Sequence, residues 1–417
     1  MHTLNISSNA DIAPSVPIRR LGAMERAFFS HGLGAQVLFS LVAEITGDID
    51  SERMSAALES LQRKNRLLSV RVVDDVDIGL AFVDSDRPID AVFVETDSRD
   101  TWQSFLASDL SRWDALVGDQ LFRVMVLRYL GGFTILFTFN HCIADGRAAI
   151  ALMSDFLKIL DGQEIDGQQR LQLMDAFVDL QEASLGQPPD YVRPAIVKSS
   201  GDVPVTISTL EFGTELTERL VIECRRNGIS VHGALCAAAV WATQSERQAP
   251  LRLSSPVDVR RTVGADAKAL GIFMALALNS LEPEPGETFW ELARRAMVSI
   301  AAAQEKKAVD SLFTVLDSIV PIHGDAQTAQ AVLAPFTLDL MISNLGKVAA
   351  PKTSSRLHVE ALWGPALNTQ IEANDVIGVT TYGGNLRMLH TGSRLGDDML
   401  RAIQQVVAEQ MLMRPGS

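Results

Sequence analysis

The chain has 417 residues, enough for two domains of ordinary size with a core each. Hydrophobic residues make up 47% of it and charged residues 21%, which is a globular composition and excludes a disordered chain. With 37 Lys and Arg against 51 Asp and Glu, the net charge is −14, so nucleic acid is excluded as an expected partner.

The first half of the chain alternates helical and strand patterns. Met54, Leu58 and Leu61 recur at helical spacing, and Gly131-Gly132 separates two apolar runs as the turn of a β-hairpin would. The predicted elements are a helix over 50–65, a strand over 67–73, hairpin strands over 121–129 and 133–139, and a helix over 147–160.

The second half repeats this mixture. Gly, Pro and Ser gather over 183–206, which predicts a linker between an N-terminal domain, 1–182, and a C-terminal domain, 207–417. The expected elements after it are helices over 214–227, 231–244 and 397–411 and strands over 251–256, 336–343, 356–363, 376–381 and 386–390. The predicted fold class is therefore α/β (α+β), with two related lobes of mixed sheet and helix.

The stretch from Phe139 to Gly146 is the strongest candidate for a functional site. An apolar strand delivers His141 into a turn, where its imidazole can face a cleft and exchange a proton near neutral pH. Asp145 is close enough in sequence to fix the turn, and Gly146 is expected to relax the backbone where strand becomes helix. A histidine that ends a strand is more often structural, so this interpretation depends on its surroundings.

The segment Asn140-His141-Cys142-Ile143-Ala144-Asp145-Gly146 resembles the H-H-x-x-x-D-G signature of a superfamily of acyltransferases that use CoA or carrier proteins. That superfamily includes nonribosomal peptide condensation domains, plant BAHD acyltransferases and mycobacterial polyketide-associated (PapA-type) acyltransferases. The other matching segments, in the order found there, are Arg20 to Glu25, Asn65 to Ser69, Gln120 to Val124, Gly228 to Leu235, Pro256 to Arg261 and Ser343 to Gly346. The resemblance thus covers most of the chain.

This resemblance implies a fold and a set of residue roles. Two chloramphenicol-acetyltransferase-like lobes would have a channel between them, and His141 would be the general base that deprotonates the acceptor. Asp145 would be structural and pair with an arginine, for which Arg260 is the candidate. Asp258 and Arg260 are expected to form a structural clamp, with Gly146 completing the support of the loop.

Two parts of the pattern leave alternatives open. Asn140 stands where the superfamily usually has His, and its amide can hydrogen-bond locally but cannot accept a proton near neutral pH. The change therefore bears on loop geometry or substrate preference. Ser343 and Asn344 suit an ordinary turn cluster as well as donors that stabilise the oxyanion of a tetrahedral intermediate.

The implied activity is transfer of an acyl group from a CoA or acyl-carrier-protein thioester to an alcohol acceptor, forming an ester in natural-product or lipid biosynthesis. No permanently bound cofactor is expected, because acyl-CoA or a phosphopantetheinyl carrier would be the co-substrate. An acyl carrier protein is the partner that a carrier-bound donor would require. An amide-forming condensation enzyme stays open, as does a non-catalytic homologue that binds the carrier or thioester.

Cysteine, histidine and hydropathy patterns bear on the remaining classes. Cys142, Cys224 and Cys236 show neither metal-ligand spacing nor a disulfide framework, which suits a reducing cytoplasm. The histidines have no metal-site spacing, so no metal is expected. Arg123 and Arg128 interrupt the longest apolar run, and the N-terminus lacks a signal-peptide core, so neither a transmembrane segment nor secretion is predicted.

Overall fold

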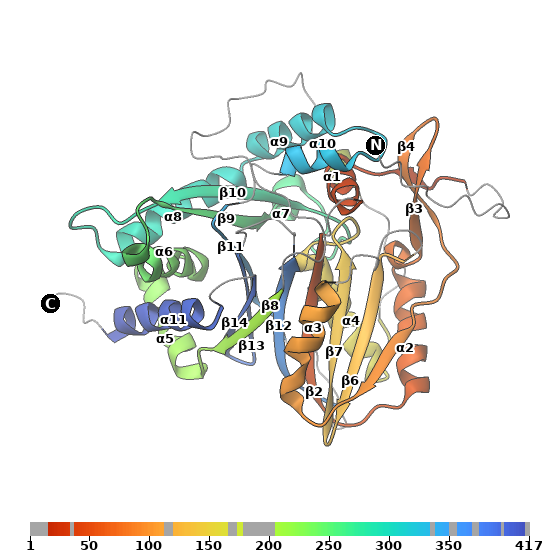
Figure 1. The fold of residues 1–417 in the computed structure, drawn as a ribbon, viewed down its shortest axis with the longest axis horizontal. Coiled ribbons are helices and arrows are strands. Elements are labelled where there is room, and N and C mark those ends of the chain that lie inside the picture. The colour runs from red at the N-terminus through yellow and green to blue at the C-terminus, as the bar shows by residue number, and fades with distance from the viewer. Residues whose placement is uncertain are drawn as a thin grey trace.

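The structure is a computed structural model that describes residues 16–33, 37–111, 120–165, 173–177, 205–333, 338–349, 357–368, 375–392 and 396–412. Within these ranges the chain forms three sheets flanked by helices (Figure 1). This confirms the predicted α/β (α+β) fold class.

The strands are β1 (Arg19–Arg20), β2 (Leu38–Thr46), β3 (Val70–Asp75), β4 (Gly79–Asp84), β5 (Ala91–Glu95), β6 (Phe122–Tyr129), β7 (Gly132–Asn140), β8 (Thr206–Glu211), β9 (Leu251–Asp258), β10 (Met274–Leu281), β11 (Leu340–Lys347), β12 (His358–Asn368), β13 (Asp375–Tyr382) and β14 (Asn385–Gly392). The helices are α1 (Ala23–Gly32), α2 (Ser51–Lys64), α3 (Trp102–Leu110), α4 (Gly146–Leu160), α5 (Thr214–Arg226), α6 (Val231–Thr243), α7 (Arg260–Val263), α8 (Phe289–Ala303), α9 (Lys306–Ile319), α10 (Ala326–Leu333) and α11 (Gly396–Leu412).

A five-stranded sheet in the order β12-β2-β7-β6-β5 forms the centre of the N-terminal lobe. Apolar residues of α2 and α4 pack on one of its faces, and those of α3 pack on the other (Figure 1). Since both faces are covered, β7 is buried at every position. β7 ends at Asn140, so His141 follows directly after the C-terminal end of a strand that is buried throughout.

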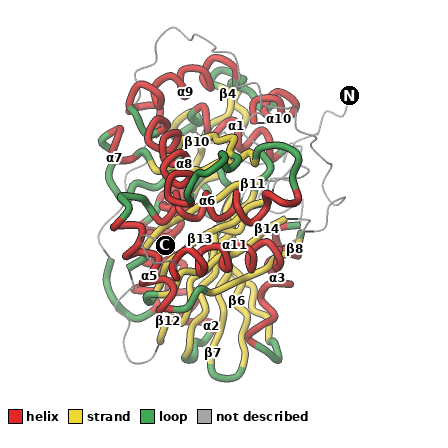
Figure 2. Tube along the Cα trace, turned by 90° about the vertical axis from the view of Figure 1, so that its left-hand side faces the viewer, coloured by secondary structure: helices red, strands yellow, loops and turns green. Residues whose placement is uncertain are grey.

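A six-stranded sheet in the order β10-β9-β11-β13-β14-β8 forms the second lobe. Helices α5, α6, α8 and α11 cover one face of it, as Figure 2 shows from the side. A third, three-stranded sheet in the order β1-β4-β3 lies near α1, α9 and α10 in Figure 1. Arg26 of α1 donates to Asp317 of α9 at 2.8 Å. This ion pair joins a helix of the second half of the sequence to a helix of the first half.

Strand β12 belongs to the second half of the sequence but completes the sheet of the first. It pairs antiparallel with β2, with Leu362 opposite Ala43. The second half of the sequence therefore contributes one strand to the sheet of the first lobe. The predicted linker, 183–206, lies outside the described residues except for its last two positions, and Thr206 already begins β8. The division into 1–182 and 207–417 stays a prediction.

Most predicted elements are present with small shifts at their ends. One difference lies at 67–73, where a strand was expected and β3 begins only at Val70. The amide of Leu68 donates to the carbonyl of Asn65, and that of Ser69 donates to Arg66, so a 3₁₀ turn over Arg66–Leu68 precedes β3. Hydropathy does not separate such a turn from a short strand.

Among the helices of the described residues, none is both long and apolar enough to cross a membrane. Cys142, Cys224 and Cys236 are free thiols, and all three are buried.

The shared strand yields a testable consequence. The indole N–H of Trp363 in β12 donates to Glu44 Oε1 of β2 at 2.6 Å, and both side chains are buried. Trp363→Phe should lower the free energy of unfolding by about 1–3 kcal/mol, because a buried carboxylate loses a donor. Urea denaturation measures this loss. Trp290→Phe is the control, since no described residue accepts a hydrogen bond from the indole of Trp290. Equal losses in the two variants would contradict a role for the Trp363–Glu44 bond.

Candidate functional site

His141 lies directly after the C-terminal end of β7, the central strand of the five-stranded sheet. Its ring stacks on Phe28 at a centroid distance of 4.4 Å and lies tilted against Phe39 at 4.7 Å. Its backbone N–H donates to the carbonyl of Val37 at 3.1 Å. These contacts fix the imidazole, and the residue as a whole is 8% exposed.

Burial also determines the charge of this imidazole. Removal from water lowers the pKa of His141 from its ordinary value, and the charge of Asp145 offsets part of that effect. Nδ1 is fully buried without a hydrogen-bond partner among the described residues. His141 is therefore neutral at neutral pH.

Asn140 supports the turn that follows β7. Its side-chain Oδ1 accepts a hydrogen bond from the backbone N–H of Cys142 at 3.0 Å, and its carbonyl accepts one from Ile143 at 3.2 Å. The side chain is buried. An amide at this position thus contributes to loop geometry, one of the two roles that the sequence left open for it.

Asp145 ties the turn to the second half of the chain. Its carboxylate caps α4 by accepting from the N–H of Ala148 at 2.8 Å. It also accepts from the N–H of Phe273 at 2.8 Å, and its own N–H donates to Gly271 at 3.0 Å. The guanidinium of Arg260 completes the set with two parallel bonds, at 2.8 and 2.9 Å.

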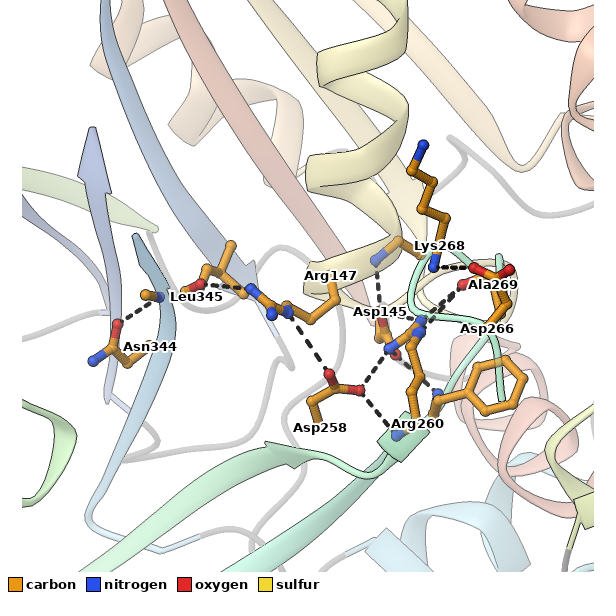
Figure 3. A network of polar contacts seen from close by, with 12 residues as sticks. Asp145, Arg147, Asp258, Arg260, Asp266, Lys268, Ala269, Asn344 and Leu345 are labelled. Atoms are coloured by element: carbon orange, nitrogen blue, oxygen red, sulfur yellow. Dashed lines mark hydrogen bonds and ion pairs between the residues drawn. The ribbon is translucent and has the colours of Figure 1, made fainter. Parts of the chain in front are cut away.

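Arg260 is the centre of a buried polar network (Figure 3). It lies between Asp145 and Asp258, donating to Asp258 Oδ1 at 2.9 Å, and it also donates to the carbonyl of Ala269 at 2.9 Å. Its guanidinium packs over the ring of Phe273 at 4.9 Å. Burial alone would lower the pKa of Arg260, but the charges of Asp145 and Asp258 outweigh it and raise the pKa. Arg260 is therefore a permanent cation that holds both carboxylates.

Arg147 extends this network along the first turn of α4. It donates to the carbonyl of Leu345 in β11 at 3.1 Å, and its Nε lies 3.7 Å from Asp258 Oδ2 (Figure 3). Asp258 thus contacts a cation on each side, and the predicted clamp of Asp258 and Arg260 is present as a set of contacts. It joins the end of β9 to the start of α4.

A cavity of about 480 Å³ lies where the two halves of the chain meet. The first half contributes Asp145, Gly146 and Arg147. The second half contributes polar and apolar groups, namely Ser230, Val231, His232, Pro256, Val257, Asp258, Met274, Ile300, Gln304 and residues 343–347. Among the described residues, no group of three or more His, Cys, Asp and Glu side chains could hold a metal ion.

Ser343 and Asn344 both line this cavity. They lie inside β11, which runs on to Lys347, so they do not end the strand as the sequence suggested. The side-chain oxygen of Asn344 accepts from the N–H of Gly346 at 2.8 Å, which leaves only its NH₂ group to act as a donor. The Ser343 hydroxyl is the more versatile of the two, because it can donate or accept.

Gly146 is required for space rather than for backbone relaxation. It is the first residue of α4, and a Cβ added there would lie 2.5 Å from Cδ2 of Leu345. Its φ is not in the left-handed region, unlike that of Gly346 at +72°. The expectation that Gly146 relaxes the backbone was therefore wrong. The absence of a side chain at this position instead allows α4 to approach β11.

The structure brings most of the predicted site together but separates its two parts. Asp145, Gly146, Asp258, Ser343 and Asn344 border one cavity. Arg260 is buried behind Asp145 and Asp258, and Asn140 and His141 are buried and do not line the cavity.

Several polar lining residues were not singled out by the sequence, among them Arg147, His232 and Lys347. Arg147 follows Gly146 directly, so its position next to the motif was a usable signal. His232 lies within the matched segment from Gly228 to Leu235, but its chemistry depends on Ser255, which the fold brings to it. Lys347 had no local pattern to distinguish it from other surface lysines.

Parts of the sequence match known proteins. Residues 201–388 match the family described as "Phthiocerol/phthiodiolone dimycocerosyl transferase C-terminus". Tyrocidine synthase 3 of Brevibacillus parabrevis is 24% identical over 310 residues, which is 66% of this chain. The chain spans only 4% of the length of that curated relative.

Solved structures share the fold over nearly the whole chain. Polyketide synthase associated protein 5 from Mycobacterium tuberculosis has a TM-score of 0.70 at 18% identity, covering 96% of this chain and 100% of that one. The first condensation domain of the CDA synthetase has a TM-score of 0.69 at 14% identity, covering 95% and 96%. F. graminearum TRI101, complexed with coenzyme A and T-2 mycotoxin, has a TM-score of 0.65 at 12% identity, covering 92% and 96%.

The fold is thus that of condensation domains and related two-lobed transferases. The similarity of residues 201–388 to that transferase family and the fold shared with condensation domains and a polyketide synthase associated protein agree with the resemblance seen in the sequence. An epimerization domain of tyrocidine synthetase B has the same fold, with a TM-score of 0.64 at 12% identity. The reaction must therefore be argued from the site.

The Asp145–Arg260 pair should dominate the stability of the site. Asp145→Ala would leave Arg260 charged and only partly compensated in the interior, so we expect a loss of about 3–5 kcal/mol in the free energy of unfolding. Asp84→Ala is the matched control, since Asp84 pairs with Arg66 on the exposed surface and should cost at most about 1 kcal/mol. Urea denaturation measures both, and similar losses would show that the buried pair has no special weight.

The His141 pKa can be tested by histidine-ring NMR. The imidazole should titrate below the ordinary value of 6.5 because its charged form is desolvated. With the folded pKa lowered, the unfolded chain binds the proton first, so stability from His141 is present above pH 6.5 and is lost as pH falls toward the folded pKa. In His141→Gln, the free energy of unfolding should fall less steeply than in wild type as the pH is lowered from 6.5 toward the folded pKa. A His141 that titrates at or above 6.5 would contradict a buried neutral base.

Proposed function

We propose that this protein is an acyltransferase that moves an acyl group from a CoA or acyl-carrier-protein thioester to an alcohol, with His141 as the general base. One observation carries the proposal. A neutral imidazole is held at the end of β7, and the turn that follows it is clamped through Asp145 and Arg260 to the other half of the chain, beside a cavity between the two halves.

The proposed reaction is direct transfer. Nε2 of His141 takes the proton of the acceptor hydroxyl as its oxygen attacks the thioester carbonyl. The tetrahedral intermediate then collapses, the C–S bond breaks, and the imidazolium returns the proton to the leaving thiolate. No acyl-enzyme forms, because the acceptor itself is the nucleophile.

The residues around His141 suit this role. A base that is neutral at the working pH can accept a proton at once, and burial keeps His141 in that state. Phe28 and Phe39 restrict the ring to one orientation. The hydroxyl of Ser343 and the NH₂ group of Asn344 are our candidates to stabilise the oxyanion, since both residues border the cavity.

The donor class is supported by the relatives. The matching family is named for a transferase of a dimycocerosyl group, and a protein of the same fold is complexed with coenzyme A. Tyrocidine synthase 3 and condensation domains supply the carrier-bound alternative, in which an acyl carrier protein is the partner. We place the activity in natural-product or lipid biosynthesis in the cytoplasm, with ester formation ahead of amide formation.

A non-catalytic homologue that binds a carrier or thioester is the second candidate. The burial of His141 favours it, because the residue is only 8% exposed and does not border the cavity. A catalytic His141 requires that a substrate reach Nε2 past Phe28 and Phe39.

Thiol release from a panel of short- to long-chain acyl-CoAs, with and without mixed alcohols and amines, tests the proposal. We expect release that depends on an alcohol and falls about 10²–10⁴-fold in His141→Ala, which is the usual contribution of a general base. His358→Ala is the control, because that histidine is exposed in β12. Release that is equal in wild type and His141→Ala, or absent from every pair of substrates, would favour the non-catalytic candidate.

A further inference from the structure

The cavity is bordered by a histidine other than His141, and no role has been given to it so far. His232 lies in the first turn of α6 and lines the cavity together with Ser230 and Val231. Its Nε2 is 2.8 Å from the hydroxyl of Ser255 in β9 and 3.6 Å from Sγ of Cys236 one turn further along α6. The imidazole is thus held from behind by buried groups.

The other ring nitrogen of His232, Nδ1, differs from Nε2 in its surroundings. Among the described residues Nδ1 makes no hydrogen bond, yet it is not one of the fully buried unpaired nitrogens, as Nδ1 of His141 is. Nδ1 therefore keeps accessible surface, and the cavity is the space that His232 borders. The site therefore offers one unused hydrogen-bonding atom on a fixed ring.

The chemistry of the cluster excludes a nucleophile. Burial raises the pKa of the Cys236 thiol to about 12, so His232 does not convert it to a thiolate. Ser255 is fully buried and does not border the cavity, so its hydroxyl lies behind the imidazole rather than in front of it. Neither group can reach a substrate that occupies the cavity.

The cluster is also uncharged. Burial lowers the pKa of His232 to about 4, which leaves a neutral imidazole at neutral pH. A neutral ring donates or accepts at Nδ1 according to its tautomer, and it brings no positive charge that would select a carboxylate or phosphate over a neutral group. The ligand group that fits is a hydroxyl or an amide.

We propose that His232 is a substrate-binding residue, which holds a neutral hydroxyl or amide of a substrate through Nδ1 while Ser255 positions its ring through Nε2. This inference rests on the proposed function, since two substrates can supply that chemistry. One is the alcohol acceptor, and the other is the pantetheine arm of the donor, which carries amides and a hydroxyl.

Two substitutions separate this role from a structural one. An asparagine amide reaches about as far as Nδ1, and a glutamine amide about as far as Nε2. His232→Asn should therefore keep the KM of the bound substrate within about threefold, whereas His232→Gln should raise it about tenfold through the loss of one hydrogen bond. A purely structural His232 would show the reverse order, because only glutamine preserves the contact with Ser255.

Ser255→Ala tests the positioning contact. It should raise the KM of the same substrate by a smaller factor than His232→Gln, and leave kcat nearly unchanged, because the ring stays in place by packing but loses its preferred orientation. A fall in kcat with KM unchanged would contradict the assignment.

A binding measurement keeps this test independent of turnover. Histidine-ring ¹⁵N spectra are recorded during titration with pantetheine and, separately, with 1-octanol, and the His232 signals are assigned from His232→Gln. A shift of Nδ1 with pantetheine assigns the group to the donor arm, and a shift with 1-octanol assigns it to the acceptor. The exposed His323 and His358 report non-specific shifts.

The outcomes distinguish the two proposals. Shifts of His232 in a protein without acyl transfer would overturn the proposed function and leave the binding role standing. Acyl transfer without any His232 shift, or a lower KM in His232→Gln than in His232→Asn, would overturn the binding role alone.

Discussion

The buried pair of Asp145 and Arg260 is the interaction on which the site depends. A guanidinium and a carboxylate taken out of water are costly, and the cost is offset only when both are fully hydrogen-bonded. Here the carboxylate also caps α4 and accepts from Phe273, while the guanidinium also holds Asp258. One ion pair thus fixes the turn after β7, the start of α4 and the end of β9 relative to one another.

That arrangement gives the two carboxylates and the two histidines different duties. Asp145 and Asp258 are both paired with Arg260, and Asp258 also lies 3.7 Å from Arg147, so the two carboxylates hold the turn and the end of β9 together. Burial keeps His141 and His232 uncharged, but they lie in different surroundings. His141 is enclosed by aromatic rings at the edge of the first sheet, whereas His232 borders the cavity from the second.

The sequence predicted the local part of this structure well. Helical spacing located α2, and the glycine pair located the β6–β7 hairpin, because both patterns depend on neighbours in the chain. Ordered motifs placed Arg260 as the candidate partner of Asp145, and the two are paired. What depends on tertiary pairing was not accessible, since nothing local to β12 indicates that it joins β2 rather than its own half. The Ser255 contact of His232 is of the same kind, and no element was predicted between 257 and 335.

The most direct measurement is a crystal structure with a stable acyl-CoA analogue in which a methylene replaces the thioester sulfur. If His141 is the general base, the analogue carbonyl should lie beside Nε2 with room for an acceptor oxygen about 3–3.5 Å from that carbon. Phe28 or Phe39 should then have moved aside from the imidazole. An analogue bound in the cavity with His141 still enclosed by both rings and its carbonyl out of reach would contradict the account.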